Sequence, residues 1–292
     1  MSDLLIVALL MGTLRMSTPL LLTAMGGLLS ERSGVVNIAL EGFMLVGAFT
    51  GAVAGYYFKS AWMGFLASMI FGGLIAALYS LFVIKLKADQ IVTGTAINLF
   101  AAGVAPFISK ILFNSTGSTP SLELAQRFVY EPIVIAILVT GFVYYLLEKT
   151  KAGLWISFAG EHPESLLTAG VHPNKIRYFS VIASGVLAAM GGASLSLFLA
   201  SSYSPMMSGG RGFMALAAVI FGKWKPLPTA AACLFFGFTD SLQIRLQGVA
   251  IGGFIIPVQF IQILPYLVTI LILSGFFGKS RAPKSLSKIF ET

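Results

Sequence analysis

Charge, cysteine and histidine are scarce in this sequence, and each shortage excludes a class of protein. Only 10% of the 292 residues are charged, whereas soluble domains carry about 25%. The single cysteine, Cys233, cannot build a disulfide framework or a thiolate metal cluster within one chain, so we expect a small buried hydrophobe. The two histidines, His162 and His172, lack the neighbouring carboxylate and cysteine ligands of a metal site.

Catalytic and nucleotide-binding motifs are also missing. The stretch SGFFGKS ends like a phosphate-binding P-loop, but that motif needs a glycine at position 273, where the chain has Leu273. The sequence offers no nucleophile–base pair, which argues against an enzyme and against a cofactor in this chain. The net charge is +8, but Lys and Arg form no dense basic face with interleaved aromatic residues, so nucleic acid is not an expected partner.

Apolar residues are abundant: 57% of the chain is hydrophobic and the mean hydropathy is +0.90. Runs of roughly 20 apolar residues recur from end to end, long enough to cross a hydrocarbon core of about 30 Å as helices. We therefore predict an all-α, polytopic transmembrane bundle, one domain over residues 1–292, with about eight or nine spans. Gly47, Gly51 and Gly55 form a smooth stripe that predicts close helix packing. The candidate spans are 4–29, 35–58, 61–84, 91–113, 128–147, 178–200, 206–222, 228–246 and 254–277.

Some of these spans are predicted to be broken or re-entrant. Arg15 and Pro19 interrupt the first, Pro257 and Pro265 interrupt the last, and the seventh has only a short apolar body after Arg211. The loops favour an N-terminus outside and a C-terminus in the cytoplasm, because roughly thirteen Lys and Arg residues then face inward and five face outward. A single re-entrant segment would reduce the count to eight spans and move the N-terminus inside.

The segment ERSGVVNIALEG, residues 31–42, places polar residues between two apolar runs. A polar side chain inside a bilayer needs a partner or a water-filled cavity. Such residues indicate either a transport pathway or bonds between helices, worth about 0.6 kcal/mol each. Asn37 and Glu41 are four residues apart and would share a face of a helix, so we interpret this pair as shaping or gating a pathway. The candidate pathway residues are Asn37, Glu41, Thr95, Asn98 and Gln243, with Gln90 as a further polar position.

The longest hydrophilic stretch, residues 148–177, is predicted on the cytoplasmic side. Pro163 and Pro173 bracket a helix of one or two turns, with Glu164 suited to its N-terminal end and Gly170 to its C-terminal end. A short amphipathic helix at this place fits docking into a partner and a solvated connector equally well.

Four motifs resemble one family of membrane proteins. They are ERSGVVNIALEGFMLVGAF, KADQIVTGTAINLFAAG, EHPESLLTAGVHP and GRGFMALAAVIFGKWKP, and the resemblance extends from about residue 14 to residue 278. They are similar to the ABC-type permeases that serve branched-chain amino acids, simple sugars such as ribose, and nucleosides. The first, second and fourth look most like the shorter of two paired permeases in the nucleoside branch. The resemblance implies half of a nucleoside translocation pathway in a bacterial inner membrane.

The resemblance also implies how ATP hydrolysis is coupled to transport. The coupling segment of this family carries Glu-Ala-Ala, three residues and Gly; Glu164 and Gly170 stand at that spacing, while Ser165-Leu166 replace the alanines. Loop 148–177 would then dock into an ATPase, and tail 279–292 would lie in the cytoplasm. The implied contacts are Glu161, His162, Glu164, Ser165, Leu166, Leu167, Gly170 and Val171. The implied partners are a second, longer permease, an ATP-binding subunit with tandem nucleotide-binding halves that holds ATP and Mg²⁺, an extracytoplasmic substrate-binding lipoprotein, and membrane lipid.

Two other functions remain open at this point. The same permease type could carry ribose or another simple sugar. A stand-alone ion-coupled carrier would instead use Glu41 and Asp240 as coupling sites, because such carriers place acids near the middle of the membrane. Asp240 and Arg245 are five residues apart, which is a poor spacing for an ion pair on one helix.

Overall fold

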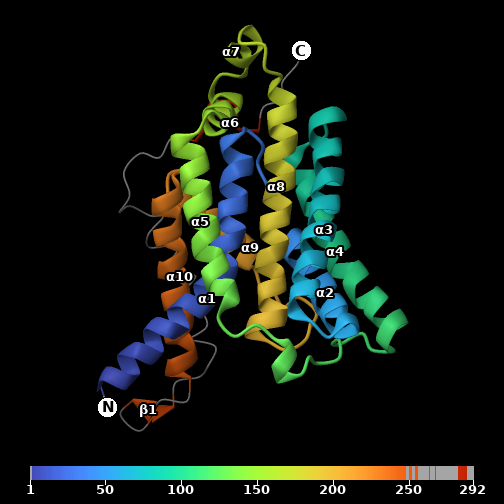
Figure 1. The fold of residues 1–292 in the computed structure, drawn as a ribbon, viewed down its shortest axis with the longest axis vertical. Coiled ribbons are helices and arrows are strands. Elements are labelled where there is room, and N and C mark those ends of the chain that lie inside the picture. Colours follow the sequence, from blue (N-terminus) through green and yellow to red (C-terminus); the bar gives the residue numbers. More distant parts are fainter. Residues whose placement is uncertain are drawn as a thin grey trace.

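The computed structural model describes residues 2–247, 250–251, 254–255, 263, 267 and 282–287. The long helices stand side by side, with α7 and the N-terminus at opposite ends of the bundle (Figure 1). We name these the α7 end and the N-terminal end. The helices are α1 (Ser2–Arg32), α2 (Leu40–Phe58), α3 (Ala61–Ser80), α4 (Gln90–Phe113), α5 (Glu131–Lys149), α6 (Lys151–Glu161), α7 (Pro163–Thr168), α8 (Pro173–Ser194), α9 (Arg211–Phe221) and α10 (Pro226–Leu246). Three short turns are η1 (Leu81–Lys85) and η3 (Leu195–Leu199), both π-helical, and η2 (Leu124–Gln126), a 3₁₀-helix.

The all-α class is confirmed, while the number of spans stays a prediction. Five helical segments in the described ranges are long and apolar enough to cross a membrane: Ile6–Arg32, Ala61–Lys85, Gln90–Phe113, Leu124–Lys149 and Pro173–Leu199. Helices α2 and α10 lie in the same bundle, because α2 packs against α3 and α8, and α10 packs along α1. The seventh candidate span contains only α9, whose 11 residues extend about 16 Å.

The last candidate span lies mostly outside the described residues, as do Pro257 and Pro265. Near its start the chain forms two short strands, β1 (Ala250–Ile251) and β2 (Phe254–Ile255), which pair antiparallel. Residues 254–255 are therefore extended where the sequence pattern predicts a helix. Two residues per strand make this pair a local turn rather than a sheet.

The predicted interruption of the first span is a bend, not a break. Helix α1 continues through Pro19, and Figure 1 shows its N-terminal part slanted against the upright remainder. Proline removes one backbone N–H from the helical ladder, which is a common cause of such bends. The charge of Arg15 is accommodated because its guanidinium carbon lies 4.9 Å from the centre of the Phe198 ring.

Glycines let α2 and α3 approach α8 closely. A methyl group built on Gly47 would collide with the backbone of Ala189, and one on Gly51 would press on Ala193. The next residue of this stripe, Gly55, faces Leu197 in the same way. The stripe is therefore a packing surface, as the sequence predicts. Cys233 is also buried as expected, in the main apolar core.

A matched pair of glycine substitutions tests this packing. Gly192→Ala places its methyl group against the carbonyl oxygen of Met44 on α2, whereas Gly141→Ala on α5 meets no described residue within 4 Å. We expect Gly192→Ala to lower stability by about 1–3 kcal/mol, and Gly141→Ala to leave it unchanged or slightly raised because alanine favours helix. Thermal melting of the detergent-purified chain measures the difference, and equal melting temperatures would contradict the close α2–α8 contact.

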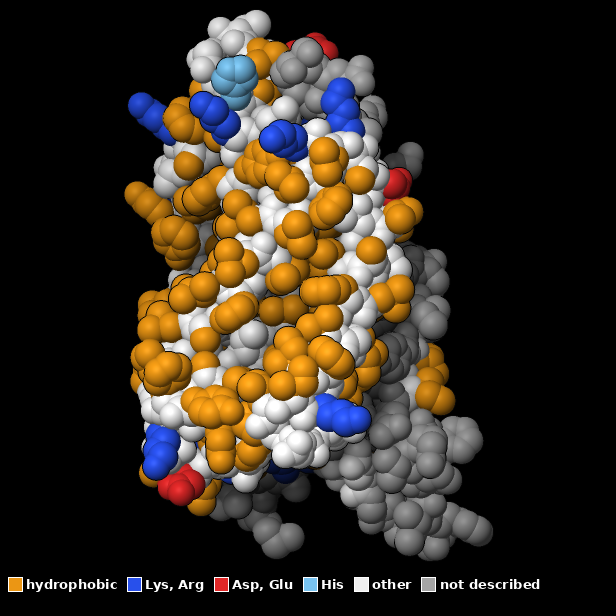
Figure 2. All heavy atoms as spheres, turned by 90° about the vertical axis from the view of Figure 1, so that its right-hand side faces the viewer, with side chains coloured by type: hydrophobic (Ala, Val, Ile, Leu, Met, Phe, Trp, Pro, Cys, Tyr) orange, Lys and Arg blue, Asp and Glu red, His pale blue; other side chains and the backbone are white. Residues whose placement is uncertain are grey.

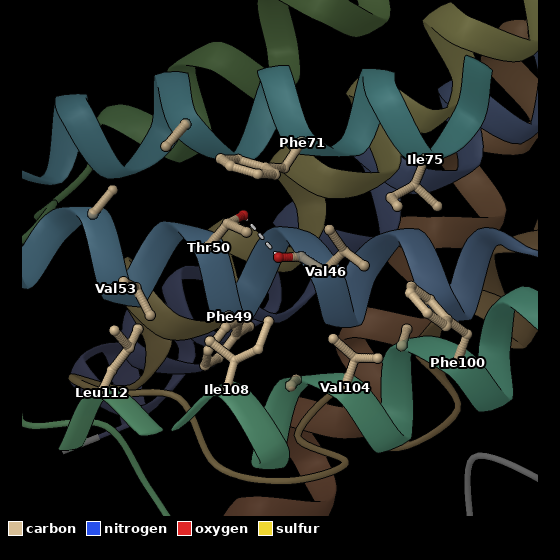
Figure 3. Close-up of a pocket in the computed structure, with 14 residues that line it drawn as sticks. Val46, Phe49, Thr50, Val53, Phe71, Ile75, Phe100, Val104, Ile108 and Leu112 are labelled. Carbon is tan, nitrogen blue, oxygen red and sulfur yellow. Dashed lines mark hydrogen bonds between the residues drawn. The ribbon is translucent and has the colours of Figure 1, made fainter. Parts of the chain in front are cut away.

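The outer surface of the bundle is apolar between two charged ends. In Figure 2, hydrophobic side chains cover the middle of the face, and Lys and Arg gather toward the top and bottom. On this side α3 and α4 diverge over α2 and leave a groove of about 410 Å³ (Figure 3). The hydroxyl of Thr50 in this groove donates to the Val46 carbonyl at 2.8 Å. Among the described residues the groove thus offers apolar surface and no convergent polar groups, which makes it unsuitable as a route for a polar solute.

Candidate functional site

The polar segment between α1 and α2 is not helical. Helix α1 ends at Arg32 and α2 begins at Leu40, so residues 33–39 form an irregular connection. The prediction that Asn37 and Glu41 share a helix face is therefore wrong, because Asn37 precedes the first turn of α2. The sequence suggested a helix through this region because its apolar residues continue past the polar ones.

Side chains from α3 and α4 satisfy the backbone of this irregular segment. The Tyr79 hydroxyl donates to the Val36 carbonyl oxygen at 2.7 Å, and the Val36 N–H donates to Gln90 Oε1 at 2.7 Å. Asn98 bridges the start of α2: its Nδ2 donates to the Ile38 carbonyl at 3.0 Å, and its Oδ1 accepts the Gly42 N–H at 2.7 Å. Non-helical backbone at membrane depth persists only where protein or water supplies such partners.

Asn37 lies inside the bundle, completely buried. Its Nδ2 donates to the Ser184 hydroxyl of α8 at 2.8 Å. Its Oδ1 is buried without a hydrogen-bond partner among the described residues. Asn37 therefore links the irregular segment to α8, while its side-chain carbonyl oxygen accepts no hydrogen bond from the described residues.

Glu41 holds the start of α9. Only 5% of the residue is exposed. Its Oε1 accepts from the Ser208 hydroxyl at 2.6 Å and from the Gly210 N–H at 2.8 Å, and its Oε2 accepts from the Gly212 N–H at 2.7 Å. The free N–H groups and the dipole at a helix N-terminus favour a negative charge. In this protein a carboxylate from α2 supplies it, at the middle height of the bundle where Figure 1 shows α9.

The loop before α9 returns into the bundle from the N-terminal end. Its first residues pair with the loop after α4, since the Leu122 N–H donates to the Ser201 carbonyl at 2.8 Å and the Thr119 N–H donates to the Tyr203 carbonyl at 3.1 Å. Its last residues reach Glu41. Residues 201–221 thus combine a re-entrant loop with a half-length helix, the type of discontinuous element that surrounds binding sites in transporters.

A charge pair links α9 to α10 beside this centre. Arg211 Nη2 lies 3.6 Å from Asp240 Oδ2, and Arg211 Nη1 donates to the Ser208 carbonyl at 3.3 Å. Arg245 is the nearest basic residue in the sequence but has a poor spacing for a pair with Asp240, whose partner Arg211 stands 29 positions earlier in the chain. Sequence spacing within one helix could not reveal it.

The five predicted pathway residues do not form one lining. Asn37, Glu41 and Asn98 gather around the first turn of α2, whereas Thr95 is exposed on α4 with its hydroxyl donating to the Ile91 carbonyl at 2.8 Å. Gln243 is half-buried near the end of α10. Asn37, Glu41 and Asn98 bond to protein groups, so they shape the centre of the bundle. Contact of any of the five with a solute stays a prediction.

The predicted coupling segment protrudes from the bundle. Helix α7 stands at one extremity of the molecule (Figure 1), between the bracketing prolines that the sequence indicated. Leu166 is buried, whereas Glu164, Ser165, Leu167 and Gly170 are exposed. Gly170 ends the segment at φ +77°, a left-handed conformation that suits glycine. The exposed side chains of α7 thus project from the end of the bundle, while Leu166 anchors the helix.

Two features of the α7 end were not found from the sequence. Helix α6 occupies part of the stretch expected to be a hydrophilic loop, and the Thr150 hydroxyl caps it by accepting the Gly153 N–H at 3.2 Å. Residues 282–287 form a strap: the Ser285 N–H donates to the Gly160 carbonyl at 2.8 Å, and the Ser287 N–H donates to the Gly34 carbonyl at 3.2 Å. The strap therefore connects α6 with the α1–α2 segment.

An apolar bundle with a bent first helix, a re-entrant half-helix and a short helix protruding at one end is the architecture expected of a membrane permease. The chain also matches, over residues 9–273, the family model described as "Branched-chain amino acid transport system / permease component". It belongs to this family. It is a multi-pass membrane subunit of the ABC-transporter type and a non-catalytic one, in agreement with the resemblance seen in its motifs.

Relatives with curated names agree with this assignment. The chain is 37% identical to the guanosine ABC transporter permease protein NupQ of Bacillus subtilis, over 94% of this chain and 93% of that protein. It is 34% identical to the nucleoside ABC transporter permease protein NupC of Lactococcus lactis, over 92% of each. It is 33% identical to the putative glucose ABC transporter permease protein TsgC13 of Haloferax volcanii, over 91% and 90%.

A more distant similarity distinguishes two kinds of permease. The nucleoside ABC transporter permease protein NupB of the same Lactococcus lactis strain is 21% identical over 94% of this chain, which covers only 81% of NupB. This chain therefore resembles NupC in both sequence and length more than it resembles NupB.

Proposed function

We propose that this chain is the shorter permease of an ATP-driven importer for nucleosides and forms half of its translocation pathway. The observation that carries the proposal is the near full-length similarity to permeases whose names state guanosine and nucleoside transport. The likeness to a putative glucose permease keeps simple sugars as the second candidate.

The proposed importer has four kinds of component. The relation to NupC and, more distantly, to the longer NupB supports a second, longer permease as the other half of the pathway. An ATP-binding subunit with tandem nucleotide-binding halves would hold ATP and Mg²⁺, and an extracytoplasmic lipoprotein would deliver the substrate. These partners follow from the family and from the lack of a P-loop in this sequence.

We place the α7 end in the cytoplasm of a bacterium and the N-terminus outside the inner membrane. The excess of Lys and Arg in the loops of the α7 end supports this orientation. The strap agrees with this orientation, because residues 282–287 lie at the α7 end whereas α10 ends near the N-terminal end of the bundle. An odd number of crossings then separates the two termini.

Arg177 offers a physical link between the docking helix and the centre. It is buried near the start of α8, four residues after Pro173. Its Nε donates to the Ser33 carbonyl at 3.1 Å and its Nη2 donates to the Ala159 carbonyl at 3.2 Å. If an ATPase displaced α7, the movement would be transmitted to α6 and α8, which flank α7. Arg177 would then transmit it to the irregular segment beside Asn37. That segment would respond by changing the access to the pathway.

Competition for uptake tests the substrate class. In cells that express the complete importer, excess unlabelled adenosine or guanosine is expected to suppress uptake of a radiolabelled nucleoside, while ribose and glucose leave it unchanged. Suppression by the sugars alone would contradict the nucleoside assignment. Accumulation in liposomes that contain this chain alone, without ATP, would favour the ion-coupled carrier.

A substitution on α7 tests the coupling role. Glu164→Lys reverses an exposed charge on the docking face, and loss of one strong contact in an interface typically costs at least about 2 kcal/mol. We expect ATP-coupled uptake to fall more than tenfold while the amount of chain in the membrane is retained. Glu123→Lys, an equally exposed reversal near the N-terminal end, is the matched control and is expected to be neutral. Normal uptake by Glu164→Lys would remove α7 as the coupling element.

A further inference from the structure

A small polar cavity opens at the α7 end, away from the proposed pathway. Its volume is about 130 Å³, several times the roughly 30 Å³ that one water occupies in the liquid. Four parts of the chain meet there: the end of α1, helix α6, the turn between α9 and α10, and the strap. The lining residues are Arg32, Ser157, Glu161, Lys223, Trp224, Lys225 and Pro283.

The cavity carries a positive charge surplus. Three of its lining residues are basic, Arg32, Lys223 and Lys225, and one is acidic, Glu161. Arg32 shares its charge with Glu148, whose Oε1 lies 3.2 Å from Nη1. The Glu161 carboxylate accepts a hydrogen bond from the backbone N–H of Lys284 at 3.4 Å. Lys284 is therefore a further basic residue beside Glu161. The two exposed lysines of the turn are therefore the groups that an incoming anion would meet.

The turn that carries these lysines is held in a fixed shape. Trp224, between them, is buried and its Nε1 donates to Glu31 Oε2 at 2.6 Å. Lys223 and Trp224 both have positive φ, +52° and +54°, a conformation that non-glycine residues adopt only when the surroundings impose it. The buried tryptophan thus fixes the backbone so that Lys223 and Lys225 both remain at the cavity.

The elements that line this cavity also carry exposed apolar side chains. Helix α6 exposes Leu154, Trp155 and Phe158, and Leu227 is exposed in the first turn of α10. Exposed tryptophan and apolar side chains beside lysines are typical of the boundary between headgroups and hydrocarbon. An anion that enters the cavity from this boundary would keep an apolar tail against the neighbouring side chains.

We propose that the cavity binds the phosphate of an anionic phospholipid headgroup, with Lys223 and Lys225 as its principal ligands. Basic pockets at the cytoplasmic ends of transmembrane helices recognise such headgroups. Inorganic phosphate has the same charged group but no acyl chains, so it would gain nothing from Leu154, Trp155 or Leu227. This inference rests on the membrane location of the chain and not on which solute it transports.

Native mass spectrometry of the detergent-purified, full-length chain tests the proposal. The probes are phosphatidylglycerol, phosphatidylcholine with the same acyl chains, and inorganic phosphate. The test variant is Lys223→Gln/Lys225→Gln, and the matched control is Lys85→Gln/Lys175→Gln, which removes two exposed lysines from the same end. A basic residue near an anionic surface contributes roughly fivefold, so the test variant should require roughly 30-fold more phosphatidylglycerol for half-saturation. The control should match the unaltered chain.

Each outcome decides for or against the site. Selective retention of phosphatidylglycerol that only the test variant loses supports it. An equal loss of phosphatidylglycerol binding in both double variants would indicate diffuse attraction to the charged surface. Binding of inorganic phosphate as strongly as phosphatidylglycerol would indicate an ion site. Either result overturns the lipid assignment. Lipid retention that is unchanged in the test variant, together with loss of the ATPase when the complete importer is purified with this variant, would show a protein-docking surface and overturn it as well. Thermal melting confirms that the variants are folded.

Discussion

Glu41→Ala is expected to abolish transport and to lower the stability of the chain substantially. The substitution leaves the Ser208 hydroxyl and the N–H groups of Gly210 and Gly212 without their acceptors. Each buried donor without a partner costs about 1–3 kcal/mol, so we expect a loss of at least ~3 kcal/mol. The half-helix α9 would then no longer be fixed to α2. Uptake assays and thermal melting of the purified chain measure the two effects.

The conservative variant separates the charge from the shape of this side chain. Glu41→Gln keeps one acceptor oxygen but replaces the other with a donor that faces an N–H or hydroxyl group. We expect intermediate stability and uptake at a few per cent of the unaltered level. Glu148→Ala, which removes an exposed carboxylate paired with Arg32, is the control, because such surface pairs contribute about 0–1 kcal/mol. If Glu41→Ala behaved like Glu148→Ala, the role of Glu41 in holding α9 would be refuted.

The second large effect is expected for Asp240→Asn. The substitution removes the countercharge of Arg211 while the size of the side chain is kept. Breaking a buried ion pair costs about 3–5 kcal/mol. Because the Arg211 side chain is 26% exposed, we expect a smaller loss of about 1–3 kcal/mol, with uptake reduced at least tenfold. Urea or thermal denaturation in detergent, together with uptake, provides the readout.

A companion substitution shows whether the effect comes from the pair. Arg211→Gln/Asp240→Asn removes both charges, so the double variant should recover part of the stability that Asp240→Asn loses. Strict additivity of the two single effects would contradict the ion pair. A proton-coupled carrier would predict a different result, in which Asp240→Asn alone abolishes transport without any loss of stability.

The sequence alone was sufficient to predict the all-α membrane class and the helices that hydrophobicity defines. Apolar length predicted the long helices, and the spacing of Gly47, Gly51 and Gly55 predicted a packing surface that the structure confirms. The prolines at 163 and 173 correctly bracketed α7. These features depend on local patterns, which a single sequence records directly.

The centre of the bundle was predicted only in part, because its geometry depends on contacts between distant segments. Polarity identified Asn37, Glu41 and Asn98 as unusual, but the expected span 35–58 made residues 35–39 part of a helix. The positions of Tyr79, Gln90 and Asn98 in the folded chain explain why that backbone can remain irregular. The pairing of Arg211 with Asp240 and the course of residues 282–287 likewise require the folded chain.

The irregular segment also imposes an order on biosynthesis. Val36 leaves the ribosome before Tyr79, Gln90 and Asn98, the residues whose side chains later bond to residues 36, 38 and 42. Until α3 and α4 have been inserted, the Val36 N–H and the carbonyl groups of Val36 and Ile38 would lack these partners, and each unsatisfied backbone group in lipid costs several kcal/mol. The first two helices are therefore poor candidates for early release into the bilayer, and the insertion machinery must retain them until the fourth arrives.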